Sequence, residues 1–156
     1  MSFINTRPTI VLAVFALSAT IFAAGDARAE LGGTMPVQQA GDTAQQRLLP
    51  GSTVRVRSTV DAGGTTINEY ATADGLIFAC AWQGPTMPDL TQLLGPYARR
   101  YQAQAAAQLD TTGALHASRV EQPDVVVETG GQMRSYVGRA WLPAAVPPGV
   151  SLTSLR

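Results

Sequence analysis

Apolar and polar residues alternate along the first segment with a clear pattern. Val54, Val56 and Val60 recur with polar residues between them, a period of two that predicts a strand with one buried face. The turn cluster Asp61-Ala62-Gly63-Gly64 follows, and a second strand is predicted over 65–72. Its alternation places Ile67, Glu69 and Ala71 on one face and Asn68, Tyr70 and Thr72 on the other.

A third strand is predicted over Leu76–Trp82, after a hairpin turn at Asp74-Gly75. Unlike the first two, this segment is apolar on both faces. Such a strand belongs in the middle of a covered sheet rather than at its edge. Gly84-Pro85 ends the strand, because proline cannot donate a hydrogen bond to the ladder.

The hydrophobic period then changes to that of a helix. Asp89 is favourable near the positive end of a helix and marks its start. Gly95-Pro96 falls inside the pattern, and proline in a helix interior costs about 3 kcal/mol. A kink or two consecutive helices is therefore predicted, ending near Leu109. The apolar face consists of Leu90, Leu94, Tyr97, Tyr101 and Ala105.

The remaining predicted elements form a hairpin. Residues 110–122 are predicted to be a loop, 123–129 a fourth strand, Gly130-Gly131 a turn and 132–142 a fifth strand. The sum, β-β-β-α-β-β, is an α+β fold, an antiparallel sheet of about five strands with one kinked helix packed on one face. The sequence does not give the position of the final hairpin in the sheet.

The two ends of the chain carry weaker patterns. Residues 30–51 are rich in glycine and glutamine and indicate a flexible amino-terminal arm, with a short helix over 42–49 as an alternative. Residues 52–142 form the single α+β domain. Residues 143–156 contain Pro147-Pro148-Gly149 and are predicted to be an extended carboxy-terminal tail.

Residues 1–29 have the pattern of a secretory signal peptide, in which Arg7 precedes an almost wholly apolar run and Ala27-Arg28-Ala29 provides a cleavage site. We expect cleavage after Ala29 by the general secretory route, because no twin-arginine pair precedes the run. An uncleaved amino-terminal anchor is the alternative. The expected location is the periplasm or the extracellular medium, with no membrane span in the mature chain.

Composition and charge narrow the classes of function. The chain has 156 residues, 46% of them hydrophobic, with 11 basic residues, all arginine, against 11 acidic residues. Loss of Arg7, Arg28 and Asp26 with the signal leaves nine arginines and ten carboxylates, a net charge near minus one. A near-neutral chain without basic clusters is not expected to bind nucleic acid or an anionic membrane.

The single histidine and the single cysteine limit the chemistry further. With only His116 and Cys80, no Cys/His cluster for zinc is present, and no metal or cofactor is expected. No G-x-S-x-G serine accompanies His116, which indicates a solvated loop residue. Cys80 lies in the strand predicted to be buried, where a thiol lacks the exposure that makes it reactive. An intermolecular disulfide is the alternative, because one cysteine cannot close an internal bridge.

Carboxylates are the remaining candidates for acid–base catalysis. Asp74 fits a turn, Asp89 a helix start and Asp124 the entry to a strand. Those in strands are predicted to pair with an arginine across the sheet, so no catalytic residue is assigned. The candidates are Glu69, Asp74, Asp89, Asp124 and Glu128, with Arg134 or Arg139 as the predicted partners of Glu69 and Glu128.

A speculative binding groove is the one site that the sequence offers. Core packing explains most of the large aromatic residues. A functional interpretation places a groove for a small ligand or peptide where the third strand meets the helix. Its residues are Trp82, Gln83, Arg134 and Tyr136.

Several stretches of the chain resemble a known family. They are NEYATADGLIFACAWQGPTMPDLTQLLG, QPDVVVETGGQMRSYVGRAWLP, the start ELGG at Glu30–Gly33 and the ending PPGVSLTSLR. Together they are similar to the uncharacterised exported bacterial proteins grouped as domain of unknown function 2844. The resemblance covers nearly the whole mature chain and implies an envelope location, and it supplies no activity, ligand or catalytic residue.

The sequence therefore favours a non-enzymatic periplasmic or secreted accessory protein that binds another protein or envelope component. A small-ligand-binding protein with a pocket near Trp82 is the first alternative. An enzyme that uses an unrecognised carboxylate pair is the second. The oligomeric state does not follow from the sequence.

Overall fold

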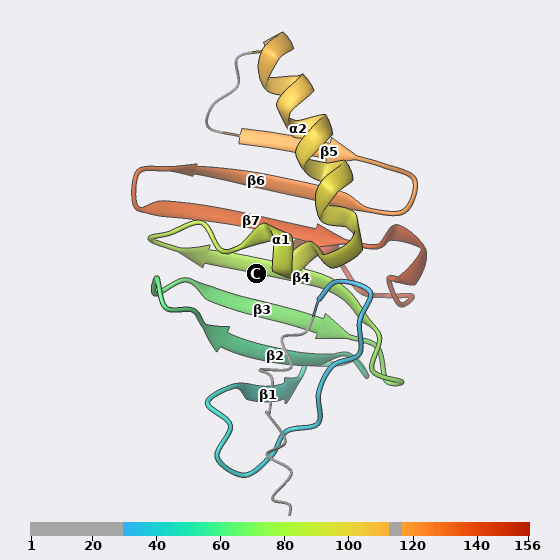
Figure 1. Ribbon diagram of the computed structural model, residues 1–156. Coiled ribbons are helices and arrows are strands. Elements are labelled where there is room, and N and C mark those ends of the chain that lie inside the picture. Colours follow the sequence, from blue (N-terminus) through green and yellow to red (C-terminus); the bar gives the residue numbers. More distant parts are fainter. Residues whose placement is uncertain (1–29, 113–116) are drawn as a thin grey trace, which may run out of the picture.

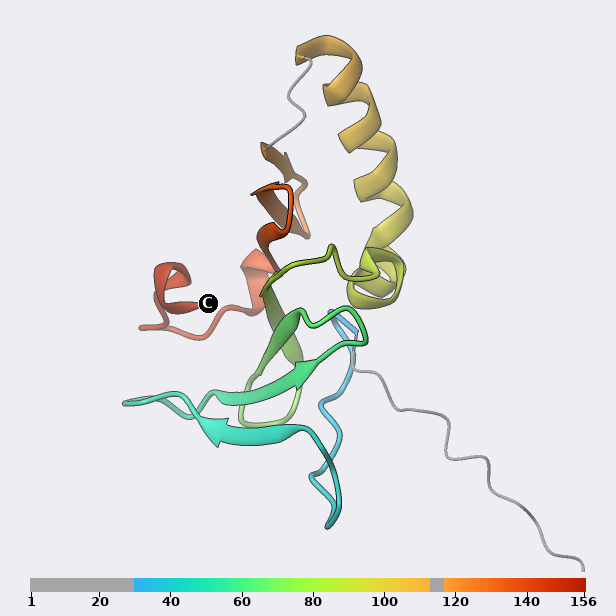
Figure 2. The same ribbon diagram turned by 90° about the vertical axis from the view of Figure 1, so that its left-hand side faces the viewer.

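The computed structural model describes residues 30–112 and 117–156. The predicted signal peptide and His116 lie outside this part of the chain. The described residues form one antiparallel sheet with a helical layer on one face and the carboxy-terminal segment on the other (Figures 1 and 2).

The sheet has seven strands in the order β1-β2-β3-β4-β7-β6-β5. Every neighbouring pair is antiparallel. An α+β fold was predicted, and the prediction of about five strands is corrected to seven. The strands are β1 (Gln45–Leu48), β2 (Arg55–Val60), β3 (Thr66–Ala71), β4 (Ile77–Gly84), β5 (Ala117–Glu121), β6 (Val126–Gln132) and β7 (Ser135–Trp141).

Strand β4 occupies the centre, as its apolar residues on both faces predicted. Its residues from Ile77 to Trp82 are all buried. The sequence left open where the final hairpin joins the sheet. The hairpin lies beside β4, because β7 pairs with β4 from Ala79↔Trp141 to Gly84↔Tyr136. The central strand therefore joins the amino-terminal meander to the carboxy-terminal hairpin.

The helical layer starts at the predicted residue. Asp89 is the N-cap of α1 (Leu90–Leu94), and its side chain accepts hydrogen bonds from the N–H groups of Thr91 and Gln92. Gly95 has a φ of 51° and starts a 3₁₀ turn, η1 (Gly95–Tyr97), which contains Pro96. Helix α2 (Ala98–Thr112) then continues, so the predicted interruption is present as two consecutive helices.

The two strands that the sequence missed lie at the edges of the sheet. Strand β1 falls inside the segment interpreted as a flexible arm, and the alternative short helix over 42–49 is wrong because Gln45–Leu48 pairs with β2. Strand β5 falls inside the predicted loop 110–122 and has one buried residue, Val120. Each of these strands has a neighbour on one side only, so each shows little of the apolar periodicity that marks an inner strand.

Each face of the sheet carries its own core. Between the helices and the sheet lies a cluster that includes Cys80 and Trp82 of β4 with Leu94, Ala98 and Tyr101. A second cluster lies on the opposite face. It includes Val56, Tyr70, Phe78, Ala79, Ala81, Val126, Trp141 and Leu155.

The segment before β1 is tied to the central strand rather than free. The Leu31 N–H donates to Leu93 O, and Gly32 and Gly33 exchange hydrogen bonds with Ile77 at 2.9 Å. The Met35 N–H donates to Gly75 O. These residues lie beside β4 before its pairing with β7 begins, on the helical side of the sheet (Figure 2).

The carboxy-terminal segment packs onto the sheet through two 3₁₀ turns, η2 (Pro143–Ala145) and η3 (Leu152–Ser154). Val146, Val150 and Leu152 lie against the second core cluster, and Leu155 is buried within it. The tail that was expected to be extended over the surface therefore packs on and covers part of one face of the sheet, opposite the helices (Figure 2).

Replacement of Leu155 by alanine tests whether this closure stabilises the fold. We expect Leu155→Ala to lower the free energy of unfolding by about 2–4 kcal/mol, because a buried leucine leaves a cavity when truncated. Leu109→Ala is the control, because Leu109 is exposed on α2, and it should cost less than about 1 kcal/mol. Urea unfolding followed by tryptophan fluorescence measures both changes. Equal losses of unfolding free energy in the two variants would show that packing of Leu155 does not stabilise the fold.

Candidate functional site

The structure does not gather the four predicted groove residues at one place. Trp82 points to the helical face of the sheet, and Tyr136 lies on that face because it alternates in step with Gly138 and Ala140. Gln83, next to Trp82 in the strand, points to the opposite face. Arg134 lies in the turn between β6 and β7, with a φ of 65°.

Trp82 is packed rather than open to a ligand. A Cβ atom on Gly138 would lie 2.2 Å from Trp82 Cζ2, so the indole ring lies over that glycine and only glycine leaves room for it. The side chain is buried, and the indole Nε1 is buried with no hydrogen-bond partner in the described part of the chain.

The opposite face of the sheet carries a hollow. The strand register sorts its side chains into rows that run across the strands. The first row, which the tail covers, contains Val56, Tyr70, Ala79, Trp141, Val126 and Glu121. The second row contains Ser58, Asn68, Ala81, Arg139, Glu128 and Arg119.

A third row lies nearest to the β2–β3 and β6–β7 turns, and we call it the open row. Val60, Thr66, Gln83, Val137 and Ala117 are all exposed. The open row consists of Val60, Thr66, Gln83, Val137, Gly130 and Ala117.

A hollow of about 380 Å³ lies between the end of the tail and the open row. Leu155 and Arg156 border it on one side, and Gln83 and Val137 on the other. Ala81 and Gly130 have little or no side chain on this face of the sheet, which leaves the space unfilled. The remaining lining residues are Trp82, Glu128, Thr129, Gly138 and Arg139.

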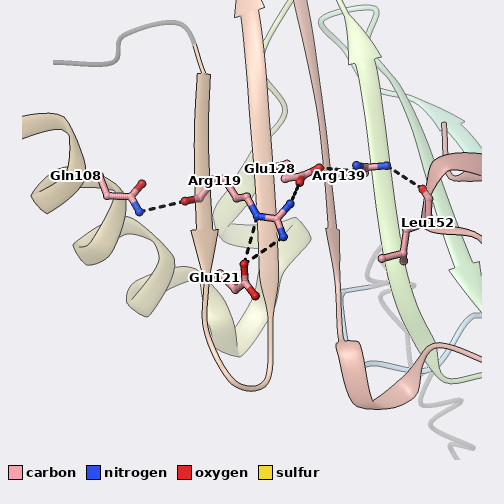
Figure 3. A network of polar contacts seen from close by, with 6 residues as sticks. All are labelled: Gln108, Arg119, Glu121, Glu128, Arg139 and Leu152. Carbon is pink, nitrogen blue, oxygen red and sulfur yellow. Dashed lines mark hydrogen bonds and ion pairs between the residues drawn. The ribbon is translucent and has the colours of Figure 1, made fainter. Parts of the chain in front are cut away.

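Charged residues beside the hollow form a connected network (Figure 3). The Arg139 Nε donates to Glu128 Oε2 at 2.6 Å, and Arg119 Nη1 donates to the other oxygen of Glu128. Arg119 also contacts Glu121 at 3.1 Å. Both guanidinium groups lie over the ring of Trp141, within 6 Å of its centroid. Glu128 therefore has both oxygens engaged and is one of the paired groups of the site.

The network and the neighbouring strands also hold the tail in place. Arg139 Nη1 donates to Leu152 O at 2.8 Å (Figure 3). At the end of the segment, the Tyr70 hydroxyl donates to Arg156 O at 2.7 Å and accepts from the Arg156 N–H at 2.9 Å. Asn68 Nδ2 also donates to Arg156 O. The backbone of Arg156 is thereby fixed, while its side chain is exposed.

The candidate carboxylates each have a structural partner. Asp89 caps α1, and Asp74 lies in the β3–β4 turn. Arg100 contacts Asp124 at 2.5 Å and lowers the pKa of its carboxyl group. The predicted Glu128–Arg139 pair is present, whereas Glu69 pairs with Arg57 at 3.0 Å instead of with either predicted arginine.

Glu69 is the one buried carboxylate of the described residues, and it lies opposite Cys80 on the helical face. Burial raises the pKa of Glu69, although the Arg57 guanidinium acts in the opposite direction. Burial also raises the pKa of the Cys80 thiol, and Glu69 adds to that shift. A buried thiol held in its neutral form is a poor nucleophile, which agrees with the structural role that the sequence indicated for Cys80.

In residues 30–112 and 117–156, His, Cys, Asp and Glu residues do not form a group of three that would hold a metal ion. The helices of this part are too short or too polar to cross a membrane.

Comparison with known proteins gives a family of unknown function. The family model described as protein of unknown function (DUF2844) matches residues 27–155. The chain belongs to this family. No curated protein matches the chain, and no solved structure matches it. What the DUF2844 protein does must therefore be argued from its own site.

Sequence reasoning missed the larger part of this site. It named Gln83 and Trp82, but it placed the groove beside the helix, whereas the hollow lies on the other face of the sheet. The missed elements are Leu155 and Arg156, which return to β3 and β4 from the end of the tail. Apolar residues after the prolines, at 150, 152 and 155, are the one sequence signal that this segment packs.

The shifted pKa of Glu69 predicts how stability depends on pH. The folded state holds the Glu69 proton more tightly than the unfolded chain, so the protein loses stability relative to Glu69→Gln as pH rises above 4.5, the ordinary pKa. Urea unfolding between about pH 4 and about pH 7 measures the difference. Asp124→Asn is the control, because the lowered pKa of that carboxyl confines its pH dependence to the region near and below 3.8, so the difference between the protein and this variant should stay nearly constant over this range. A difference between the protein and Glu69→Gln that is constant with pH would contradict this account.

Proposed function

We propose that this DUF2844 protein is an exported, non-enzymatic accessory protein that binds another protein at the hollow beside Leu155 and Arg156. The observation that carries the proposal is the hollow itself, a space of about 380 Å³ on a sheet face that the tail leaves partly uncovered. Its border combines the apolar residues Val137 and Leu155 with the polar residues Gln83 and Arg156.

Such a border suits the binding of a protein side chain. Interfaces between proteins depend on a few apolar anchors that fill pockets, surrounded by polar groups that fix their orientation. Val137 is 45% exposed at the edge of the hollow, which leaves apolar surface for an anchor to cover. The hollow therefore has the components of an anchor pocket.

Two further observations support a role in binding rather than in catalysis. The carboxylates of the site do not form an acid–base pair, because Glu128 accepts from two arginines. The thiol of Cys80 is buried in the sheet, away from the hollow. Binding needs none of these groups to be free.

Export is the second half of the proposal. It rests on the signal pattern of residues 1–29 and on the resemblance to exported proteins. We place the protein in the periplasm or the extracellular medium.

A small-ligand-binding protein is the second candidate. The volume of the hollow falls within the range of small-molecule sites, which starts at about 300 Å³. Trp82 and Gln83 are among the lining residues, although the hollow lies on the face opposite to the one that the sequence suggested for this candidate.

The processed amino terminus tests export. We expect the protein recovered from the cell envelope or the medium to begin at Glu30, as measured by intact mass, because the A-x-A pattern directs cleavage after Ala29. Ala29→Arg should block processing, whereas Ala24→Leu, inside the apolar run, should not. Recovery of the unprocessed chain from the cytoplasm alone would contradict export.

Site-specific photo-crosslinking in cells tests the binding surface. A photoreactive phenylalanine analogue at Gln83 or Val137 should give a discrete protein adduct, because both side chains are exposed at the border of the hollow. The same analogue at Arg99, which is exposed on α2 on the other side of the sheet, should not give that adduct.

The controls separate a specific adduct from chance collisions. The adduct at Gln83 should disappear when Val137 is replaced by glutamate in the same chain, while the amount of protein stays the same. Equal adducts at Gln83 and Arg99, or no adduct at Gln83 and Val137, would contradict protein binding. In the second case, a small molecule that co-purifies with the protein and is lost in Val137→Glu would support the alternative candidate.

A further inference from the structure

The open row extends the candidate site well beyond the hollow. It crosses six strands, from Val60 on β2 to Ala117 on β5. With about 4.8 Å between neighbouring strands, it spans about 24 Å. A small molecule in the hollow would leave most of this length uncovered. An extended peptide rises about 3.4 Å per residue, so about seven residues would cover it.

The open row is uncharged and carries two exposed valines. Val60 is 68% exposed and Val137 is 45% exposed, although valine is usually buried. On the β6 and β5 side of Val137, Gly130 and Ala117 add no bulky side chain. None of the six positions of the open row is charged. A segment with apolar residues would therefore find a surface to cover at two separated points.

The charged groups around the open row differ in their pairing. Glu128, next to the hollow, is engaged by Arg119 and Arg139. Asp61, beside Val60, accepts hydrogen bonds from the N–H groups of Gly63 and Thr65. By contrast, the guanidinium of Arg156, which borders the hollow, makes no ion pair within the described residues. A carboxylate is its natural complement.

A second unpaired cation lies at the turn next to the open row. Arg134 is exposed between β6 and β7, beyond Gly130 and Val137, and has no ion pair within the described residues. The two unpaired arginines thus lie near opposite borders of the same stretch, Arg156 at the tail and Arg134 at the turn. An acidic occupant would meet favourable charge at both borders.

We propose that the open row binds an extended segment of about seven residues from a partner protein, one that combines apolar and acidic residues. An apolar side chain of the segment fills the hollow beside Val137, and a carboxylate of the segment pairs with Arg156. This inference rests on the proposed function and adds the chemistry of the partner. A neutral or basic segment lacks the ion pair and binds less tightly.

Selection from random nonapeptides displayed on phage, with the purified exported protein as the target, tests this chemistry. We expect the enriched peptides to carry both apolar and acidic residues. A fluorescein-labelled copy of the most enriched peptide, followed by anisotropy, should bind at least about tenfold more weakly to Val137→Glu, which places a charge in the apolar surface. Binding should also weaken as salt rises from about 50 mM to about 500 mM.

Arg156→Gln and Arg99→Gln form the matched pair of variants. Arg156→Gln keeps the backbone hydrogen bonds to Tyr70 and removes only the guanidinium, so we expect a loss of affinity of about fivefold or more. Arg99→Gln removes an exposed guanidinium from α2 and should leave the affinity unchanged. Both side chains are exposed, and unchanged urea unfolding would show that both variants are folded.

The outcomes separate this inference from the proposed function. Enrichment of basic or neutral peptides, no enrichment, or affinity that Arg156→Gln leaves unchanged would overturn the inference. The in-cell adduct at Gln83 would then still support protein binding of another chemistry. Acidic and apolar peptides that bind as expected, together with the absence of any in-cell adduct, would support the chemistry of the open row and contradict the proposed function.

Discussion

The burial of β4 on both faces is the constraint on which the rest of the structure depends. A strand that carries Phe78, Cys80 and Trp82 in a sheet needs a cover on each side, since exposed apolar area costs about 25 cal/mol per Å². The helices supply one cover. The other comes from Val150, Leu152 and Leu155 of the tail. The tail covers only part of the sheet face opposite the helices. The uncovered part of that face contains the hollow and the open row.

Much of the centre of this fold could be predicted from the sequence. The predictable features depend on neighbours close in the chain or on strong apolar periodicity. They are the alternation in β2 and β3, the apolar residues on both faces of β4, and the helix cap at Asp89. The edge strands could not be found in this way, because β1 has the polar sequence QQRL and β5 buries only Val120. Their pairing is supplied by the sheet rather than by their own pattern.

The candidate site was predictable only in part, for a related reason. A strand pattern shows that Trp82 and Gln83 point to opposite faces, and it does not show which face the helix covers. The face with the hollow is completed by Arg156, which lies 86 residues after Tyr70, its hydrogen-bond partner. Contacts of such long range leave no local signal in the sequence, whereas the cross-strand pair of Glu128 and Arg139 could be proposed from strand positions alone.

The hydrogen bonds between Tyr70 and the backbone of Arg156 affect the order in which the chain folds. Contacts between residues this distant along the chain form late. The intervening chain loses conformational entropy before the contact can stabilise the fold. The second face of β4 cannot close until residues 152–156 are at hand. A chain of this design stays open until almost its whole length is available, and becomes compact only when its last residues have joined the sheet.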